Sequence, residues 1–366
     1  MTLRDRLIAR IRARGPMSFA DYMEASLYDP DDGYYSTRVA LGFEGDYLTA
    51  PDLSPHFGRS LSRAFADQWT ILGRPASWDL VEAGAGRGTL LRDVLTSLER
   101  ERPDAAKGVR PAIVEVSTKL RREQAHALDG RDLRWASEPR ALAPLHGVIY
   151  ANEILDAFPV HVLVRTDDGI REVYVEEKDG RLVEILRTPN PGDLRYRVPE
   201  HLPLGGRWEV SVRAESWVAG LAAAMTRGYV IFVDYGGDEV ELLTRLGTGT
   251  VRGFSRHRLL MDPFADPGAH DLTASVNFTA IRRAAEGAGF TFVGRTSQRD
   301  MLLALGIRDV VARPSTPIDQ LRAFSQRSAV DTLLEPSGFG GFQVVCFAKD
   351  APIEGLRIFA PRTVRA

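Results

Sequence analysis

The stretch LVEAGAGRGTLLRDVL, from Leu80 to Leu95, joins a strand-like run to a helix-like run through glycines at every second position. The strand-like run is WDLVEA (78–83), and the helix-like run begins at Thr89. The glycines between them are Gly84, Gly86 and Gly88. Glycine has no Cβ and tolerates positive φ, so such loops usually let a ligand approach the backbone. The stretch therefore predicts a binding loop between a strand and a helix.

The spacing of the glycines indicates which ligand this loop binds. A phosphate-binding Walker loop needs Gly-x-x-x-x-Gly-Lys-Ser/Thr, and a dinucleotide loop needs Gly-x-Gly-x-x-Gly. Neither pattern fits Gly-x-Gly-x-Gly, and Glu82 stands two residues before the first glycine. A carboxylate there repels a pyrophosphate and suits a cation. S-adenosylmethionine (SAM) carries a sulfonium and an ammonium group and no phosphate, so we expect SAM as the cofactor.

A second carboxylate supports this interpretation. Glu115 lies near the end of the next strand-like run, RPAIVEV (110–116), where an acidic residue in such folds can accept hydrogen bonds from ribose hydroxyls. It lies 27 residues after Gly88, more than the usual spacing of about 20, and the polar segment ERERPDAAKG accounts for the extra length. The alternative is a tight strand-to-helix turn with Glu115 as a solvated strand end. We favour the SAM site.

The wider pattern predicts an α/β fold. From Trp78 onward, apolar strands alternate with amphipathic helices, which indicates a mostly parallel sheet with helices on both faces. Between about residues 158 and 206 the period changes to two, which predicts an antiparallel insertion. We expect an N-terminal helical cap with a cofactor-covering loop over residues 1–75, and a Rossmann-like catalytic domain over 76–366. The glycine-rich stretch after VDYG (233–236) is expected to be irregular.

Composition excludes several classes of protein. The 366 residues carry a formal net charge of −2, which argues against nucleic-acid binding through a broad basic surface. The single cysteine, Cys346, excludes an intrachain disulfide, and its alternating context indicates a buried thiol. No apolar run reaches the length of a membrane span, and no histidine cluster suggests a metal site. The Arg-rich N-terminus superficially resembles a transit peptide, but Asp5 and an apolar face favour a docked helix, so we expect a cytoplasmic protein. That face comprises Leu3, Leu7, Ile8 and Ile11.

Six segments together resemble one known family. They are FADYMEASLYDPDDGYY (19–35), GDYLTAPDLSPHFG (45–58), LVEAGAGRGTL (80–90), ANEILDAFPV (151–160), VDYG (233–236) and DLTASVNFTAI (271–281). This ordered set resembles the MidA family of SAM-dependent methyltransferases, which includes a mitochondrial protein-arginine methyltransferase. The resemblance implies the class I SAM-methyltransferase fold and methyl transfer to an arginine of a protein substrate.

The resemblance also implies that an N-terminal loop forms part of the cofactor site. On this sequence the loop supplies Thr49, Ser54 and Phe57, although Ser54 also fits a helix cap and Phe57 a core residue. The sequence departs from the family where Ala83 and Ala85 flank Gly84, in place of Leu and Pro. Asp52 stands where Glu is common, and Asn277 where Asp is common, which removes a proton-accepting role at position 277.

The segment YANEILDAFPV (150–160) is where we expect the catalytic residues. Arginine is protonated at neutral pH, so its methylation benefits from carboxylates that bind the guanidinium. Glu153 and Asp156 follow an apolar strand, and they share a face if a helical turn begins there. Asn152 is a candidate for binding SAM or the methyl acceptor. The alternative gives Asp156 a capping role and leaves Glu153 solvated.

One weaker candidate for the site, Asp234, remains. Asp234 is a further strand-end carboxylate, while His257 and Asp271 lie in the loop after it.

Three rival functions also remain. A small-molecule O- or N-methyltransferase would keep the cofactor and change the acceptor. A SAM-binding assembly or scaffold protein would show little turnover. A dinucleotide-dependent oxidoreductase is disfavoured by Glu82 and the glycine spacing. The sequence does not indicate the oligomeric state.

Overall fold

The computed structural model describes residues 1–38, 49–245, 249–255, 258–260, 262–310 and 317–359, so His257 lies outside the described residues. The chain forms two compact units. The first contains residues 1–47, 155–218 and 236–283, and the second contains residues 48–154, 219–235 and 284–366. Each unit is built from segments that are far apart in the sequence.

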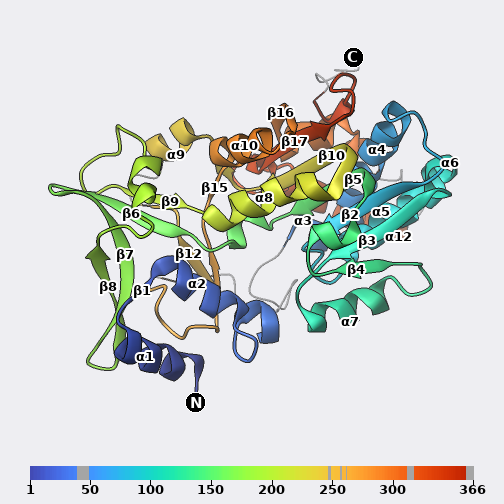
Figure 1. Ribbon diagram of the computed structural model, residues 1–366. Coiled ribbons are helices and arrows are strands. Elements are labelled where there is room, and N and C mark those ends of the chain that lie inside the picture. Colours follow the sequence, from blue (N-terminus) through green and yellow to red (C-terminus); the bar gives the residue numbers. More distant parts are fainter. Residues whose placement is uncertain (39–48, 246–248, 256–257, 261, 311–316, 360–366) are drawn as a thin grey trace. The chain divides into compact units, whose positions relative to one another are not determined.

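The second unit holds a seven-stranded sheet in the order β16-β17-β10-β5-β2-β3-β4 (Figure 1). The pairs from β10 to β4 are parallel, whereas β17 is antiparallel to both β10 and β16. This confirms the mostly parallel sheet that the sequence predicts. The strands are β2 (Trp78–Ala83), β3 (Val109–Val114), β4 (Arg134–Ala136), β5 (Leu145–Asn152), β10 (Met225–Asp234), β16 (Thr291–Ser297) and β17 (Gln343–Lys349).

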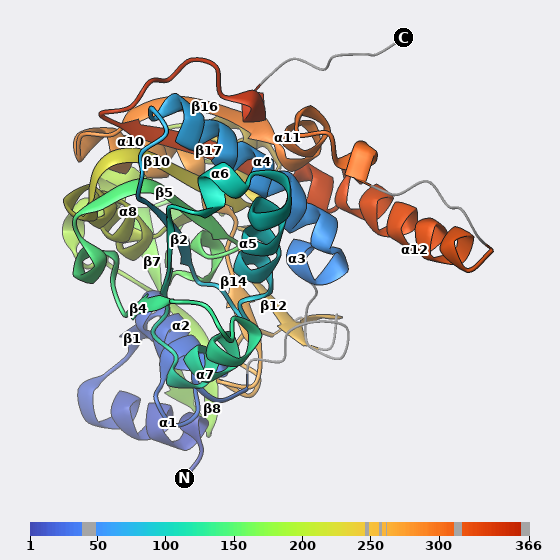
Figure 2. The ribbon, with the colours of Figure 1, turned by 90° about the vertical axis from the view of Figure 1, so that its right-hand side faces the viewer.

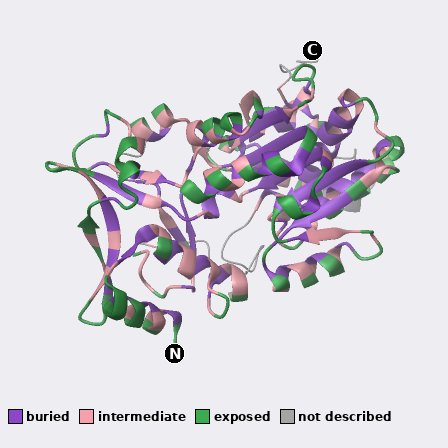
Figure 3. Cartoon of the chain, in the orientation of Figure 1, coloured by how far each residue is buried: buried purple, intermediate pink, exposed green. Residues whose placement is uncertain are grey.

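The central strands of this sheet are covered on both faces. Successive side chains of a strand point to opposite faces, yet every residue of β2 is buried, as are nearly all residues of β5 (Figure 3). The helices of this unit are α3 (Ala50–Leu53), α4 (Pro55–Ile71), α5 (Thr89–Glu101), α6 (Pro103–Ala106), α7 (Thr118–Ala127), α11 (Gln298–Ala304) and α12 (Pro317–Leu333). Helices α8 (Val212–Ala224) and α10 (Phe278–Gly287) each have residues in both units. The buried β17 residue Cys346 confirms the expected structural thiol.

Helix α4 shows how local sequence sets a helix start and its buried face. Ser54 is the N-cap and its hydroxyl accepts the His56 backbone N–H at 3.2 Å, while Pro55 occupies the first helical position. The apolar face that the sequence predicts is buried in one core with residues of β2, β5 and α5. That face comprises Phe57, Leu61, Ala64, Phe65, Trp69 and Leu72.

The first unit contains the predicted antiparallel insertion. Strands β6 (His161–Thr166), β7 (Gly169–Lys178) and β8 (Arg181–Arg187) pair antiparallel through tight turns. The sequence did not reveal that β1 (Met17–Ser18) and β9 (Arg207–Val210) complete this five-stranded sheet. A two-residue strand such as β1 has no recognisable period, because its partner β7 lies about 160 residues along the chain.

The N-terminal helix packs into the same unit. Helix α1 (Leu3–Arg14) buries Leu3, Leu7 and Ile11 in a core shared with α2 (Phe19–Tyr28) and the antiparallel sheet. This confirms a docked amphipathic helix. Within the described residues, no helix combines the length and apolarity that crossing a membrane requires.

The stretch after residue 235 is more regular than expected. It forms α9 (Glu239–Arg245) and two small sheets, one pairing β11 (Gly236–Gly237) with β15 (Val276–Asn277). The other contains β12 (Arg252–Ser255), β13 (Arg258–Leu260) and β14 (Asp271–Thr273). The expectation of an irregular stretch was wrong because these strands are too short for a hydrophobic period to develop.

Candidate cofactor site

The register of the parallel strands brings most of the predicted site residues to one edge of the seven-stranded sheet. Ala83 at the end of β2 pairs with Val114 of β3 and Ala151 of β5, and Asn152 pairs with Val233 of β10. The glycine loop, Glu115, Asn152 and Asp234 therefore follow strand ends at the same edge. Open α/β sheets bind ligands at this carboxyl edge.

The three loop glycines have different roles. All have positive φ, +68° at Gly84, +49° at Gly86 and +78° at Gly88. A Cβ on Gly84 would lie 2.9 Å from the Ile154 side chain, and a Cβ on Gly88 would lie 3.3 Å from the Gln124 backbone. These two glycines thus allow close packing of neighbouring segments as well as the turn. The role of Gly86 in admitting a ligand to the backbone stays a prediction.

Glu82 is buried within the second unit. Its carboxylate accepts hydrogen bonds from the Tyr150 hydroxyl at 3.1 Å and from the Leu91 backbone. Burial outweighs these bonds and raises the pKa of Glu82 to about 8, so the neutral form predominates at pH 7. The expected repulsion between Glu82 and a pyrophosphate is therefore weak at neutral pH. The glycine spacing therefore carries the distinction from a dinucleotide site, because an acidic residue on the ribose hydroxyls is common to both kinds of site.

Glu115 presents an oriented carboxylate at the end of β3. One oxygen accepts the Ser117 backbone N–H at 2.8 Å, and the other accepts the Gln124 side-chain amide at 3.1 Å. The side chain is 7% exposed, and burial raises the pKa of Glu115 against these hydrogen bonds. Each oxygen retains capacity for a further donor, which fits the predicted binding of ribose hydroxyls.

Sequence reasoning missed Gln124, which also donates to the Gly86 carbonyl at 2.9 Å. On α7 it lies between Leu120 and Leu128, at a spacing of four residues, and all three are buried. A polar residue that interrupts such an apolar stripe was the available signal. Gln124 connects the glycine loop with Glu115.

The N-terminal loop residues have structural partners of their own. Thr49 donates its hydroxyl to Asp52 at 2.8 Å, and Asp52 also pairs with Arg87 of the glycine loop at 2.8 Å. Ser54 caps α4, and Phe57 is fully buried in the core. Ser54 is therefore a helix cap and Phe57 a core residue, as the alternative interpretations of these two residues expected. Cofactor contact by Thr49, Ser54 and Phe57 stays a prediction.

The end of β5 carries an orphan acceptor beside a strained residue. Asn152 donates its amide nitrogen to Glu153 Oε1 at 2.8 Å, and its buried Oδ1 has no partner within the described part of the chain. Glu153 has a φ of +52°, which is costly for a residue other than glycine. The Glu153 N–H donates to the Val233 carbonyl at 2.8 Å, and the Ile154 N–H donates to Asp234 at 3.2 Å. Asp234 thus helps to hold this strained turn.

Asp156 does not share a helical turn with Glu153. The backbone forms a short 3₁₀ helix over Leu155–Ala157, so the spacing that would align the two side chains on one helix face is not realised. Asp156 is buried in the first unit, where its carbonyl accepts the Ala274 N–H at 2.9 Å. Catalysis by Glu153 and Asp156 stays a prediction.

Two other positions of the first unit have local explanations. Asn277 precedes α10 and accepts the Ala280 N–H at 3.1 Å, so it acts as a helix cap. Asp271 accepts the Tyr35 hydroxyl at 2.9 Å. Both residues have identified structural contacts in this unit.

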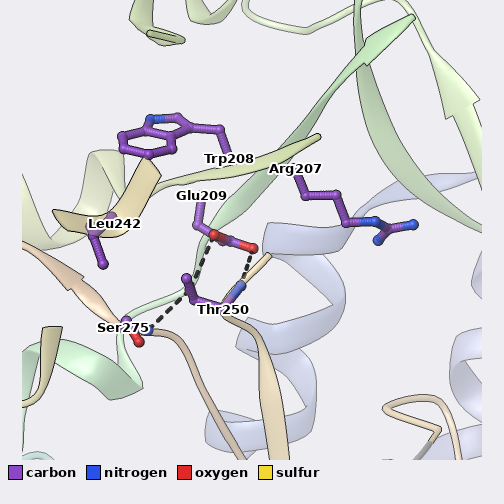
Figure 4. A pocket seen from close by; sticks show the side chains of 6 residues that line it. All are labelled: Arg207, Trp208, Glu209, Leu242, Thr250 and Ser275. Atoms are coloured by element: carbon purple, nitrogen blue, oxygen red, sulfur yellow. Dashed lines mark hydrogen bonds between the residues drawn. The ribbon is translucent and has the colours of Figure 1, made fainter. Parts of the chain in front are cut away.

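A small pocket of the first unit contains none of the predicted site residues (Figure 4). It is lined by Arg207, Trp208, Glu209, Leu242, Thr250 and Ser275. Glu209 accepts the N–H and the hydroxyl of Thr250 at 2.8 and 3.1 Å, and the Thr250 hydroxyl accepts the Ser275 N–H at 3.1 Å (Figure 4). These polar groups bind one another, which indicates a structural role.

The hydrogen-bond acceptors at the carboxyl edge suit SAM. Ribose hydroxyls and an ammonium group donate hydrogen bonds, and the Glu115 carboxylate and Asn152 Oδ1 are acceptors. Among the described residues, no three histidine, cysteine, aspartate or glutamate side chains group as metal ligands would. The glycine loop and Glu115 are the residues that would hold the cofactor, and Asn152 stays a candidate for binding SAM or the methyl acceptor.

Comparison with known proteins agrees with SAM as the cofactor. The family model described as "putative S-adenosyl-L-methionine-dependent methyltransferase" matches residues 60–296. The chain is 32% identical over 336 residues to the mitochondrial protein arginine methyltransferase NDUFAF7 of Danio rerio, covering 82% of this chain and 76% of that protein. Its human counterpart is 31% identical, over 82% of this chain and 72% of that protein.

A solved structure extends the similarity to the whole fold. A protein from Burkholderia thailandensis, bound to S-adenosyl-homocysteine (SAH), is 32% identical and superposes with a TM-score of 0.87. The match covers 98% of this chain and 95% of that one. The carboxyl-edge site and these matches lead to one assignment: the chain belongs to the MidA family of SAM-dependent methyltransferases, with the class I fold and SAM as its cofactor.

Proposed function

We propose that this methyltransferase transfers the methyl group of SAM to an arginine side chain of a protein substrate. The orphan acceptor at the end of β5 carries the proposal, because a guanidinium has five N–H donors and no acceptor. Asn152 Oδ1 offers an acceptor, and the neighbouring Glu153 offers a negative charge. The names of the relatives from Danio rerio and human, protein arginine methyltransferases, support the same acceptor.

The chain's own residues orient the acceptor and hold its charge. When bound, SAM supplies an electrophilic methyl group: a nitrogen–carbon bond forms as the carbon–sulfur bond breaks, and neutral SAH leaves. Glu153 binds the guanidinium, localises its positive charge and accepts the proton that the methylated nitrogen loses. The strained backbone of Glu153, held by Val233 and Asp234, keeps the carboxylate at the strand end. Alignment of this kind supplies a large share of such an acceleration.

The direct test uses SAM labelled on its methyl group. The purified protein is incubated with this SAM and a lysate of cells that lack the protein, and the protein and small-molecule fractions are then separated. The proposal predicts label in a discrete protein band, recovered as methylarginine after hydrolysis. Label only among small molecules would assign a metabolite acceptor, and SAH binding without any transfer would favour a scaffold role; either result contradicts the proposal.

Replacing Glu153 separates transfer from cofactor binding. In Glu153→Gln, the methylation rate should fall about 10²- to 10³-fold, because the charge that binds the guanidinium and accepts its proton is lost. SAH affinity should stay within about twofold of the wild type, because the proposal assigns Glu153 to the methyl acceptor and not to the cofactor. Asp168→Asn, at an exposed carboxylate of the β6–β7 turn, is the matched control. An unchanged rate in Glu153→Gln would remove Glu153 from the catalytic residues.

A further inference from the structure

Gln124 makes three hydrogen bonds from a fully buried position on α7. Its amide nitrogen donates to the Gly86 carbonyl at 2.9 Å and to Glu115 Oε2 at 3.1 Å. Its amide oxygen accepts the indole N–H of Trp135 at 3.0 Å. One side chain therefore contacts the glycine loop, the end of β3 and the short strand β4.

These partners leave the amide one orientation. An indole N–H only donates, so it must face the amide oxygen, and the carbonyl and carboxylate oxygens must face the two amide hydrogens. Rotating the amide by 180° would place oxygen against oxygen at Gly86 and Glu115, and N–H against N–H at Trp135. Unsatisfied buried polar groups are costly, so the structure selects a single state of this side chain.

The two groups that the amide nitrogen holds are the ones predicted to meet the cofactor. Glu115 has its other oxygen on the Ser117 N–H at 2.8 Å, so the two oxygens are positioned by the N-cap of α7 and by a residue within α7. Gly86 lies at the centre of the glycine loop with a φ of +49°. Helix α7 also abuts the loop at Gly88, where an added Cβ would lie 3.3 Å from the Gln124 Cα. Removing the amide would therefore free Glu115 and the loop together.

We infer that Gln124 is a positioning residue that couples the glycine loop to Glu115, and so sets the preference of the site for a cofactor with ribose hydroxyls. The inference rests on SAM as the cofactor and on the predicted role of Glu115. It does not depend on the acceptor, so it stands even if the acceptor is not an arginine. The amide of Gln124 acts through Glu115, whose carboxylate accepts the hydroxyl hydrogens.

The test measures the affinity for two ligands by calorimetry. The ligands are SAH and an SAH analogue that lacks both ribose hydroxyls, and the proteins are the wild type, Gln124→Met, Glu115→Ala and the double variant. Methionine keeps the length of glutamine and loses all three hydrogen bonds. Gln124→Met should bind SAH about tenfold more weakly, within the range for partners in one hydrogen-bonded network. It should bind the analogue with less than about a threefold loss.

The double variant and a matched control complete the design. In the Glu115→Ala background, Gln124→Met should weaken SAH by less than about a threefold further loss, because only the contacts with the Gly86 carbonyl and Trp135 are left to remove. Gln298→Met removes another fully buried amide of the same unit, on α11, and should leave both affinities unchanged. Equal losses for the two ligands, or additive losses in the double variant, would overturn the inference.

A second substitution covers the case in which Gln124→Met does not fold. Trp135→Phe removes the indole N–H that fixes the amide, keeps an aromatic ring of smaller size, and leaves both amide donors in place. It should weaken SAH about twofold to threefold and leave the analogue unchanged. Equal affinity of Trp135→Phe and the wild type for SAH would contradict the coupling.

Discussion

Carboxyl groups are buried at both edges of the seven-stranded sheet, but the partners of these groups differ between the two edges. At the amino edge, Asp79 is fully buried and pairs with Arg110 at 2.7 Å and Arg134 at 2.6 Å, and it accepts the His146 N–H at 2.8 Å. At the carboxyl edge, Glu82 and Glu115 have hydroxyl, amide and backbone partners, and neither forms an ion pair with a described residue. At the amino edge, ion pairs with two arginines neutralise the buried charge of Asp79. At the carboxyl edge, hydrogen-bond acceptors remain available for a cationic ligand that carries hydroxyl groups.

This contrast predicts that substitutions at the two edges change different properties of the protein. The amino edge should control the free energy of unfolding, and the carboxyl edge should control cofactor affinity. Two substitutions test that separation, and a third tests the protonation of the buried Glu82, from the largest expected change in free energy to the smallest.

Asp79→Ala should destabilise the protein by about 3 kcal/mol, because it removes a buried partner of two arginines and leaves the His146 N–H unsatisfied. The half-exposed side chains of Arg110 and Arg134 limit the loss, since water can solvate them. Urea denaturation measures the change. The SAH affinity of the folded variant should equal that of the wild type, and a large loss of affinity would break the separation of the two edges.

Gly86→Val should weaken SAM binding more than about 100-fold, equivalent to about 2.7 kcal/mol. A β-branched side chain is strained at a φ of +49° and blocks the approach of a ligand to the backbone. Calorimetric titration with SAM measures the change. Gly169→Val, in the β6–β7 turn at a φ of +108° with open space around it, is the matched control for backbone strain. Wild-type affinity in Gly86→Val would contradict the assignment of the loop.

Glu82→Gln should change how stability depends on pH. The pKa of Glu82 rises from 4.5 to about 8 in the folded protein, so folding binds a proton between these values. The wild type then loses stability relative to Glu82→Gln as the pH rises from about 5 to about 8.5, by on the order of 1 kcal/mol for each pH unit. Parallel denaturation curves at several pH values measure this difference. A difference that is constant over this range would show that Glu82 is not a buried neutral acid.

The sequence predicted the parts of the fold that have a local period. The bounds of β2 agree with the run WDLVEA, because an apolar strand before a glycine loop is distinctive. The start of α4 at Pro55 follows from its cap chemistry. The pairing of β1 with β7 was not predictable, since two residues carry no pattern and their partners are remote in sequence.

The candidate site was predictable in its location and less so in its contacts. Strand-end positions placed Glu115, Asn152 and Asp234 at one edge, and the register confirms it. The positive φ of Glu153 could not be read from residue type, because glutamate rarely adopts it. The network of Gln124 joins three segments through tertiary contacts, so only its interruption of an apolar stripe was visible beforehand.

The most direct test of the carboxyl-edge cofactor site is amide hydrogen exchange of the wild-type protein with and without saturating SAH. We predict slower exchange in peptides covering residues 84–91, 115–124 and 150–154, which follow or include the strand ends at the carboxyl edge. Peptides covering residues 109–111 and 143–147, at the amino edge around Arg110 and His146, should exchange at unchanged rates. Bound SAH that slows exchange at the amino edge, or that leaves the three carboxyl-edge peptides unaffected, would contradict the assignment.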